Sequence, residues 1–318
     1  MTSIIFMGTP DFSVPILEAL ANSSDYEILA VVTQPDKPIG RKKILTPSPV
    51  KAAAQNLNLP VYQPEKLTKS DELQTLIDLA PDLIVTAAYG QFLPKKLLAA
   101  AKIMPVNVHG SLLPQYRGGA PIQRAIMNGD TETGVTIMEM VAKMDAGDMF
   151  SQVKVPILPT DTSADVFAKL SLAGRDLLLE TLPKIINGTI IKVSQDEEKV
   201  TIAPNIAPEE EQLDLYLTAQ QLTNKVRALD PDPVAYLKLN GERIKIWSSY
   251  AVDLSTSLDP GSVVKADKKH LWLAAGSGSV WAVTELQPAG KKKMPISAFM
   301  NGAGQTLSAG QTVVQDAE

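Results

Sequence analysis

The stretch Asn107–Ile126, NVHGSLLPQYRGGAPIQRAI, decides the fold, because it runs from a short apolar strand through a glycine-rich loop towards a helix. The strand, Val106–Val108, is rich in valine, as strands buried on both faces are. Pro121 suits the first turn of a helix that we expect to reach about Asn128. The stretch therefore predicts one strand–loop–helix unit of an α/β protein.

The rest of the first half repeats this unit, since apolar runs typical of buried strands alternate with helical patterns. The expected strands are Ile4–Met7, Ile28–Thr33 and Leu83–Ala87, and the expected helices are Val14–Ala21, one that opens with Val50–Ala54, and Ser70–Leu79. This alternation predicts a doubly wound, mainly parallel sheet of the Rossmann-like type. Ligands bind such sheets at the carboxyl ends of the strands, where the quoted stretch leaves its own strand.

The chain beyond that stretch completes the first domain. Val135–Met140 has the pattern of a further strand, and Lys143–Asp148 that of a loop. A capping box at Thr162–Asp165 opens a long helix that Asn187-Gly188 closes. Residues 189–207 are polar and irregular, which is typical of a linker. The sequence therefore ends the first domain just before that linker.

The last third of the chain changes character after one expected helix, Ala219–Leu229. Asn240-Gly241 marks a tight hairpin between the first two strands that follow. Short strands at even spacing predict a small β-barrel; they are expected at Ala235–Leu239, Arg243–Trp247, Gly261–Val264, Leu271–Ala274 and Val280–Leu286. We therefore expect a first domain over residues 1–188 and a second, smaller domain over residues 208–318.

The composition limits the chemistry that the protein can perform and indicates its place in the cell. The absence of cysteine excludes disulfides and thiolate chemistry, and two histidines far apart in the chain do not favour a metal site. No apolar run approaches the roughly 18 to 20 residues of a membrane span. The N-terminus carries no pattern of a targeting peptide. We expect a cytoplasmic monomer without a metal or a membrane partner.

The charge distribution points to local rather than general binding of polyanions. A net charge of −5 argues against a surface that grips nucleic acid as a whole. Two basic patches nevertheless stand out, Arg41–Lys43 with nearby Lys37, and Lys291–Lys293. On the residues alone, a solvated run of charges is the more common meaning of such a patch.

Asn107 and His109 carry the chemistry that we predict. Alternate residues of an extended strand point to the same side, so their amide and imidazole can face one substrate atom. A carboxylate beside an imidazole stabilises the protonated ring and fixes its tautomer, and Asp145 or Asp148 in the later loop can supply it. An amide with an imidazolium stabilises an oxyanion, which predicts attack on a carbonyl group.

Two other functions are disfavoured by missing patterns. Ser111 follows closely and carries a hydroxyl, but no strand–turn–helix elbow of the G-x-S-x-G type surrounds it, so it is not expected to be a nucleophile. Gly8 follows the first strand, where a dinucleotide-binding fold carries three glycines, yet it stands alone. Neither a serine hydrolase nor an NAD-binding enzyme is therefore expected.

Several motifs together resemble a known family. The quoted stretch, with TGVTIMEM (133–140) and MDAGD (144–148), resembles the formyltransferases that use 10-formyltetrahydrofolate. The segments FMGTPDFS (6–13), VVTQPDKPIGRKKILTPSPVK (31–51), AAYGQFLP (87–94) and LQPAGKKKM (286–294) extend the resemblance over nearly the whole chain, to the methionyl-tRNA formyltransferase family. In that family the barrel is an OB-like domain that contacts tRNA, which implies the same for the second domain.

The resemblance also implies roles for individual residues. The implied catalytic residues are Asn107, His109 and Asp145, and the implied folate-binding residues are Ser111, Leu112, Leu113 and Pro114 with Tyr89, Gly90, Gln91 and Phe92. Phe12 is implied near the methionyl side chain, and the implied tRNA contacts are Arg41, Lys42 and Lys43 in the first domain and Lys291, Lys292 and Lys293 in the second. The chain departs from the family in ALDPDPVAY, where Asp232 and Tyr236 stand in a region that is often aromatic.

The implied reaction transfers the formyl group of 10-formyltetrahydrofolate to the α-amino group of methionyl-initiator tRNA. An alternative keeps the folate and changes the acceptor to a small amine, either a sugar nucleotide or a purine precursor. A second alternative is a binding module for folate or RNA without catalysis. The second domain and the Arg41 loop favour the tRNA acceptor, because a small acceptor needs neither.

Overall fold

The computed structural model describes residues 1–40 and 42–314, which pack as two compact units. Unit 1 consists of Met1–Pro121, Glu132–Pro156 and Phe167–Pro204. Unit 2 consists of Ile122–Thr131, Ile157–Val166 and the chain from Asn205 onward. Residues 189–204, most of the segment whose composition is typical of a linker, thus pack with unit 1. Two short segments from the part of the chain before this linker pack with unit 2.

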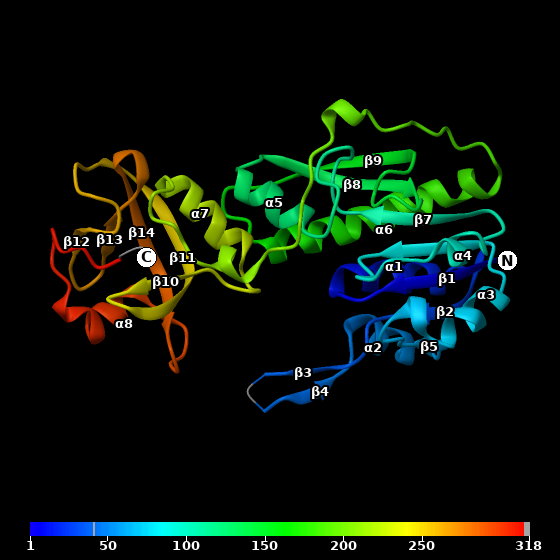
Figure 1. The fold of residues 1–318 in the computed structure, drawn as a ribbon, viewed down its shortest axis with the longest axis horizontal. Coiled ribbons are helices and arrows are strands. Elements are labelled where there is room, and N and C mark those ends of the chain that lie inside the picture. The colour runs from blue at the N-terminus through cyan, green and yellow to red at the C-terminus, as the bar shows by residue number, and fades with distance from the viewer. Residues whose placement is uncertain (41, 315–318) are drawn as a thin grey trace. The chain divides into compact units, whose positions relative to one another are not determined.

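Unit 1 is built on a sheet with the strand order β5-β2-β1-β6-β7-β8-β9 (Figure 1). Its strands are β1 Thr2–Gly8, β2 Tyr26–Val32, β5 Val61–Tyr62, β6 Leu83–Ala87, β7 Met104–His109, β8 Glu132–Glu139 and β9 Met149–Pro156. All neighbours from β5 to β7 are parallel, whereas β8 is antiparallel to β7 and to β9. The predicted doubly wound, mainly parallel sheet is confirmed.

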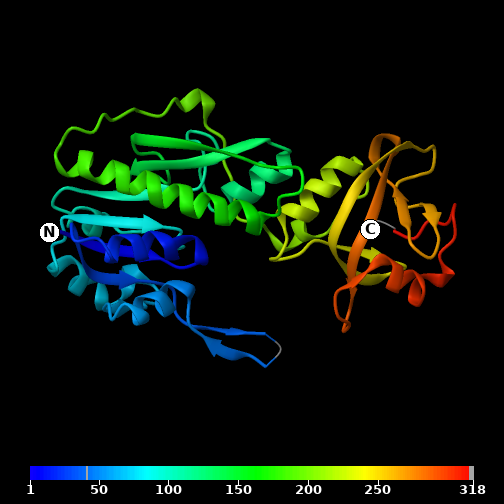
Figure 2. The same cartoon turned by 180° about the vertical axis from the view of Figure 1, so that it is seen from behind.

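Helices cover both faces of this sheet. They are α1 Val14–Ala21, α2 Pro49–Asn56, α3 Glu72–Asp78, α4 Lys95–Leu98 and α6 Ser163–Ile186. Apolar residues of α3 and α4 pack on one face, in a cluster with Ile5 and Met7 of β1. Figure 2 shows α1 and α6 across the opposite face. A Cβ at Gly174 of α6 would lie 2.9 Å from the Val108 side chain, so this glycine lets the helix approach β7 closely.

Besides the short β5 and α4, two features of unit 1 are not predicted by the sequence pattern. One is β9, which forms the edge of the sheet. The other is an antiparallel hairpin in the basic region, β3 Lys37–Ile39 and β4 Ile44–Thr46, which we call the arm. Both involve short or polar strands, which lack the run of apolar residues that identifies the central strands.

Unit 2 contains a curved antiparallel sheet with the order β10-β11-β14-β13-β12, and β15 pairs with β14. Its strands are β10 Tyr236–Leu239, β11 Glu242–Ser255, β12 Val263–Ala266, β13 Leu271–Ala274, β14 Ser279–Pro288 and β15 Met294–Pro295, and its helices include α5 Pro121–Asn128, most of which lies in this unit, α7 Ala219–Ala228 and α8 Ile296–Met300. Asn240 and Gly241 both have positive φ, as the predicted hairpin requires. The OB-like barrel domain is confirmed as this antiparallel half-barrel, which packs around the fully buried Trp281.

An ion pair joins α5 to the start of the second domain within unit 2. Arg124 Nη2 donates to Glu210 Oε2 at 2.9 Å, and the backbone N of Ala207 donates to the same oxygen at 3.0 Å. The hydrogen bond from Arg124 is the main cause that lowers the pKa of Glu210 to about 2. Because the folded pKa lies below the unfolded value of 4.5, the carboxylate stabilises the fold above pH 4.5, and this contribution is lost as the pH falls towards 2.

We therefore predict that Glu210→Gln lowers the stability at neutral pH and that the difference from wild type shrinks as the pH falls from about 4.5 to about 2. The measurement is the denaturation midpoint as a function of pH. Glu209→Gln is the matched control, because Glu209 is exposed and has no ion pair among the described residues. A difference that stays constant over this pH range would show that Glu210 does not contribute in this way.

Candidate functional site

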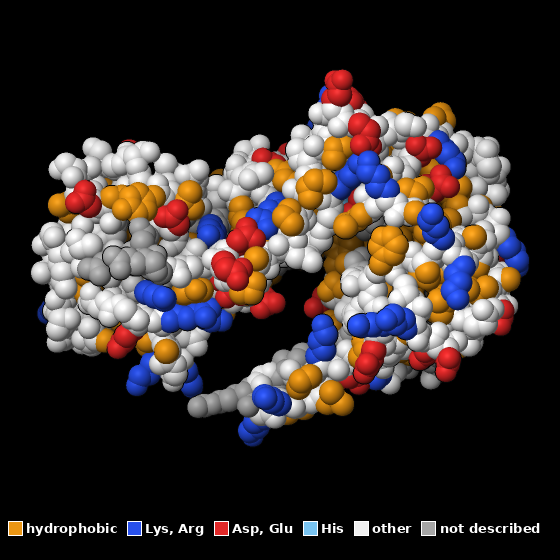
Figure 3. Space-filling view, in the orientation of Figure 1, with side chains coloured by type: hydrophobic (Ala, Val, Ile, Leu, Met, Phe, Trp, Pro, Cys, Tyr) orange, Lys and Arg blue, Asp and Glu red, His pale blue; other side chains and the backbone are white. Residues whose placement is uncertain are grey.

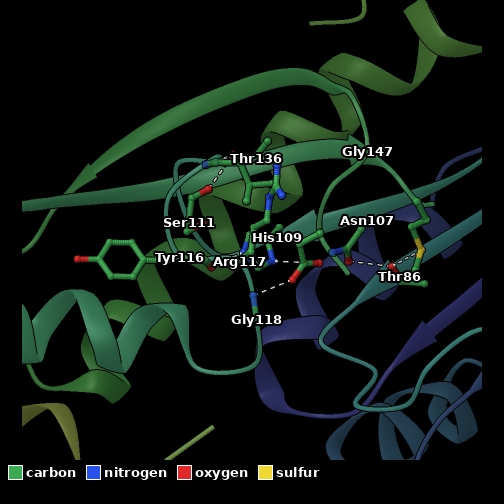
Figure 4. A network of polar contacts seen from close by, with 12 residues as sticks. Thr86, Asn107, His109, Ser111, Tyr116, Arg117, Gly118, Thr136 and Gly147 are labelled. Atoms are coloured by element: carbon green, nitrogen blue, oxygen red, sulfur yellow. Dashed lines mark hydrogen bonds and ion pairs between the residues drawn. The ribbon is translucent and has the colours of Figure 1, made fainter. Parts of the chain in front are cut away.

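Asn107 lies in β7 directly beside Thr86 of β6, its partner in the parallel register. Thr86 Oγ1 donates to Asn107 Oδ1 at 2.8 Å, which orients the amide (Figure 4). Among the described residues no acceptor is found for Asn107 Nδ2. A strand-held amide with an unused N–H is a suitable donor for a substrate oxygen.

The ring of His109 lies between two oxygen atoms at the end of β7. Its Nε2 is 3.0 Å from the carbonyl oxygen of Tyr116, and its Nδ1 is 3.7 Å from Asp145 Oδ1. A carbonyl oxygen only accepts, so Nε2 carries a proton and donates to Tyr116. The second nitrogen, Nδ1, then faces the Asp145 carboxylate across a gap that is longer than a hydrogen bond.

Asp145 is the carboxylate that faces the ring, which settles the choice that the sequence left open. Its Oδ2 accepts from the backbone N of Gly118 at 2.9 Å, and its Oδ1 faces His109. Asp148 instead accepts a hydrogen bond from Ser194 Oγ at 2.8 Å. Asp145 lies in the loop between β8 and β9, and with φ of +48° it adopts the left-handed conformation.

The side chains of the segment 111–114 hold their own loop. Ser111 is fully buried, and its Oγ donates to the carbonyl oxygen of Gln115 at 2.7 Å. Thr136 Oγ1 on β8 donates to the Ser111 carbonyl at 2.7 Å and accepts from the backbone N of Leu113 at 3.1 Å. Gln152 on β9 donates to both Thr136 Oγ1 and the Leu113 carbonyl. The Ser111 hydroxyl is therefore already used, while Leu112 and Pro114 are only partly buried.

The segment 89–92 is anchored in the same way. Gln91 Oε1 accepts from the backbone N of Leu67 at 2.9 Å, and its Nε2 donates to the carbonyl of Pro64 at 3.0 Å. Tyr89 is buried, and burial raises the pKa of its phenol. These two side chains therefore fix the loop from within.

The tip of the loop 89–92 is exposed to solvent. Phe92 is a large apolar side chain with 59% of its surface exposed, and Gly90 has φ of +85°. Two residues that the sequence did not identify hold the loop below the tip, since Thr9 Oγ1 and Gln34 Nε2 both donate to the carbonyl oxygen of Tyr89, at 2.9 and 3.2 Å. The tip therefore presents the Phe92 ring on a loop that hydrogen bonds hold at Tyr89.

Phe12 follows β1 and is buried. Its ring packs edge-on against Phe167 of α6, with 6.3 Å between the ring centroids, and Ser171 Oγ donates to its carbonyl oxygen at 2.7 Å. Only 5% of its surface is exposed, so any contact with a substrate uses a small part of the ring.

The predicted tRNA contacts lie in both units. Arg41 falls outside the described residues, whereas Lys42 and Lys43 are exposed at the end of the arm and have no ion pair among the described residues. Figure 3 shows cationic side chains projecting from the arm. In unit 2, Lys291 and Lys292 are exposed, while Lys293 pairs with Glu285 at 2.7 Å and lies 5.0 Å from the centre of the Trp247 ring.

Two other kinds of site are absent from residues 1–40 and 42–314. These ranges contain no group of three or more His, Asp or Glu side chains that could hold a metal ion. Within the same part of the chain, no helix combines the length and apolar character needed to span a bilayer.

The fold and site together define an α/β enzyme that acts on a carbonyl group, and comparison with known proteins identifies its family. Residues 1–182 match the model described as "Formyl transferase", and residues 205–304 match "Formyl transferase, C-terminal domain". The chain is 60% identical to "Methionyl-tRNA formyltransferase" of Latilactobacillus sakei subsp. sakei (strain 23K), over all of both chains. It is 54% identical to the protein of that name from Pediococcus pentosaceus, over 99% of both chains. The chain belongs to the formyl transferase family, in its methionyl-tRNA formyltransferase branch.

Solved structures of lower identity share the fold. "WlaRD, a sugar 3N-formyl transferase", matches with a TM-score of 0.67 at 18% identity, over 92% of this chain and 99% of that one. HypX from Aquifex aeolicus in complex with tetrahydrofolic acid matches with a TM-score of 0.61 at 18% identity, over 95% of this chain and 47% of that one. At these identities the likeness concerns the fold alone.

Thr136 offers a test of how the loop 111–114 is held. We predict that Thr136→Val lowers the free energy of unfolding by about 1 to 3 kcal/mol, because it leaves buried partners of the hydroxyl without hydrogen bonds. Chemical denaturation measures this loss. Thr133→Val is the matched control, because Thr133 is equally buried on the same strand and has no side-chain hydrogen bond among the described residues. Equal losses in the two variants would contradict the role of Thr136.

Proposed function

We propose that the protein transfers the formyl group of 10-formyltetrahydrofolate to the free α-amino group of methionyl-initiator tRNA, giving N-formylmethionyl-tRNA for translation initiation. Relatives named for this activity are 60% and 54% identical to the chain over nearly the full length of both proteins, which supports the acceptor and the donor. The observation that carries the chemistry is the unused N–H of Asn107 beside the His109–Asp145 pair.

The residues present fit the folate. Bound 10-formyltetrahydrofolate supplies the formyl carbon and has a flat ring system with an aryl group. The exposed Phe92 and the partly exposed Leu112 and Pro114 offer apolar contact to such a flat molecule. Because the polar side chains of Ser111 and Gln91 are used inside the protein, we propose that both loops bind the folate through apolar edges and main-chain groups.

The transfer step needs an oxyanion stabiliser and a route for a proton. Asn107 Nδ2 donates to the carbonyl oxygen as negative charge develops on it, and the charged ring of His109 adds a favourable field. The attacking amine must be neutral. A free α-amine has a pKa near 7.7 to 8.0, and the aminoacyl ester lowers it, so no large further shift is needed. Asp145 Oδ1 has no hydrogen bond among the described residues, so it is placed to accept the proton that the amine loses and to deliver it to the departing nitrogen.

Both domains contribute to binding of the acceptor, and the first domain also binds the folate. We assign the catalytic domain to residues 1–188, the connection to residues 189–207, and a tRNA-binding domain to residues 208–318. The arm and the Lys291–Lys293 patch supply positive charge for the phosphates. Phe12 lies near the methionyl side chain in this assignment. We place the enzyme in the cytoplasm, because its acceptor is used there, and we propose that it acts as a monomer.

The direct test is to incubate the protein with 10-formyltetrahydrofolate and charged initiator tRNA and to assay formyl-methionine. Charged elongator methionine tRNA is the control for acceptor choice. Formylation of the initiator supports the proposal. Transfer to a small amine without transfer to either tRNA would contradict the proposal and show that the acceptor is a small amine.

The role of Asn107 predicts a specific kinetic defect. Losing one oxyanion donor costs about 3 to 4 kcal/mol, so Asn107→Ala should lower kcat by roughly two to three orders of magnitude. Folate affinity should remain nearly unchanged, because this donor acts mainly in the transition state. Single-turnover kinetics and equilibrium folate binding measure the two effects. A loss of kcat below about fivefold with chemistry rate-limiting would contradict the assigned role.

The arm predicts a separate defect in tRNA use. Replacing Lys42 and Lys43 by glutamine should raise KM for tRNA and reduce its salt dependence, by up to about 0.9 in the log–log slope for each phosphate that the arm no longer neutralises. Turnover of a minimal aminoacyl substrate should stay unchanged, because the arm lies outside the chemical site.

The matched control for the arm is the double glutamine variant of Lys95 and Lys96. These exposed lysines of α4 give the same change in net charge at another place on unit 1. An equal rise in KM for both double variants would show a general charge effect. Equal damage to the minimal substrate would show that the arm is structural.

A further inference from the structure

Residues Val193–Ala203, which we call the strap, are tied to unit 1 at both ends. Val193 exchanges two backbone hydrogen bonds with Met149 at the start of β9, at 2.8 and 2.9 Å. At the other end the backbone N of Ala203 donates to the carbonyl of Arg117 at 2.7 Å. The strap therefore connects the loop after β7 with the loop between β8 and β9, the two loops that place the partners of His109.

One side chain of this region turns inward. From Ile191 to Lys199 every side chain is exposed except that of Gln195. Its Oε1 accepts from Arg117 Nε at 2.9 Å, and its Nε2 donates to the carbonyl oxygens of Asp145 and Gly147, both at 2.8 Å. Both N–H groups of the amide are thus committed to the loop that carries Asp145.

Arg117 fixes the direction of this amide. Only 3% of its surface is exposed, and its Nη2 donates to Glu197 Oε1 at 2.8 Å. That hydrogen bond is the main cause that lowers the pKa of Glu197, so the guanidinium has a charged partner. A flipped Gln195 amide would point N–H at the N–H of Arg117 and oxygen at two carbonyls, so only one orientation is satisfied.

The backbone that Gln195 binds has an unusual conformation at Asp145. Residues with a side chain adopt the left-handed conformation only when their surroundings hold them in it, and Asp145 adopts it. In this conformation Asp145 Oδ2 reaches the backbone N of Gly118 and Oδ1 faces His109. Without the two hydrogen bonds from Gln195, the loop is free to relax and the carboxylate to turn away from the ring.

We propose that Gln195 is a positioning residue for formyl transfer. Its amide donates to the carbonyl oxygens on both sides of Ala146 and so orients the Asp145 carboxylate towards His109. The inference rests on the proposed function for the roles of Asp145 and His109. Gln195 itself does not reach the reacting atoms.

The test compares Gln195→Leu, which removes both ends of the amide, with Gln195→Glu, which keeps an acceptor for Arg117 and loses both donors. Each should lower kcat by about tenfold to a hundredfold, the loss typical of a misplaced catalytic group, with KM for tRNA nearly unchanged. Ser194→Ala is the matched control, because Ser194 Oγ also binds this loop but at Asp148. It should keep the kcat of wild type.

A spectroscopic readout separates positioning from simple stabilisation. The chain has two histidines, so the ring nitrogen resonances of His109 can be assigned by comparison with a His270→Asn variant. In the free enzyme these resonances should shift in Gln195→Leu and Gln195→Glu and stay in place in Ser194→Ala. If Gln195→Leu does not fold, Gln195→Glu carries the same comparison.

Three results would overturn the inference: a folded Gln195 variant that keeps wild-type kcat, one in which the His109 resonances do not move, or an equal loss of kcat in Ser194→Ala. Failure of the proposed function is distinct, because it appears as a wild-type protein that does not formylate methionyl-tRNA. The His109 resonances still test the positioning role of Gln195 in that case.

Discussion

The pairing of His109 with Asp145 is the constraint on which the rest of the site depends. Their side chains are 6% and 15% exposed, and taking polar groups out of water costs free energy unless their hydrogen-bonding atoms find partners in the protein. Tyr116 supplies the acceptor for the second ring nitrogen, and Gly118 the donor for the second carboxylate oxygen. The loop after β7 therefore serves both members of the pair.

This requirement explains why several residues of these loops have positive φ. Tyr116 and Asp145 have φ of +60° and +48°, conformations that residues with a side chain adopt only when their surroundings hold them. Gly118 has φ of +129°, and a Cβ there would lie 2.5 Å from the carbonyl oxygen of Ala203. The strap thus packs so closely on the loop that position 118 accepts only glycine. The positive φ values and the close packing therefore occur in the same loops.

The sequence predicted the sheet and the placement of Asn107 and His109 on one strand, because both rest on local signals. Apolar runs such as Leu83–Ala87 identify strands wherever they pack, and the spacing of Asn107 and His109 places both on one strand. The spacing did not distinguish Asp145 from Asp148, because that choice depends on the conformation of a loop. Gln195 carries no signal for a related reason: in a polar, irregular segment an inward glutamine looks like its exposed neighbours, and only the distant Arg117 distinguishes it.

The same limit applies to reading polar residues near a site as ligands. Ser111 and Gln91 lie in the two loops assigned to folate, yet their side chains bind their own protein, and the open groups are an amide N–H and the apolar Phe92. A net charge of −5 misleads in the same way about tRNA. Release of counterions depends on the few phosphates that cations actually meet, so in the proposed function two exposed lysines on the arm contribute to binding even though acidic groups elsewhere outnumber them. In the proposed function both substrates are thus recognised by a few locally placed groups, which average properties of the chain do not reveal.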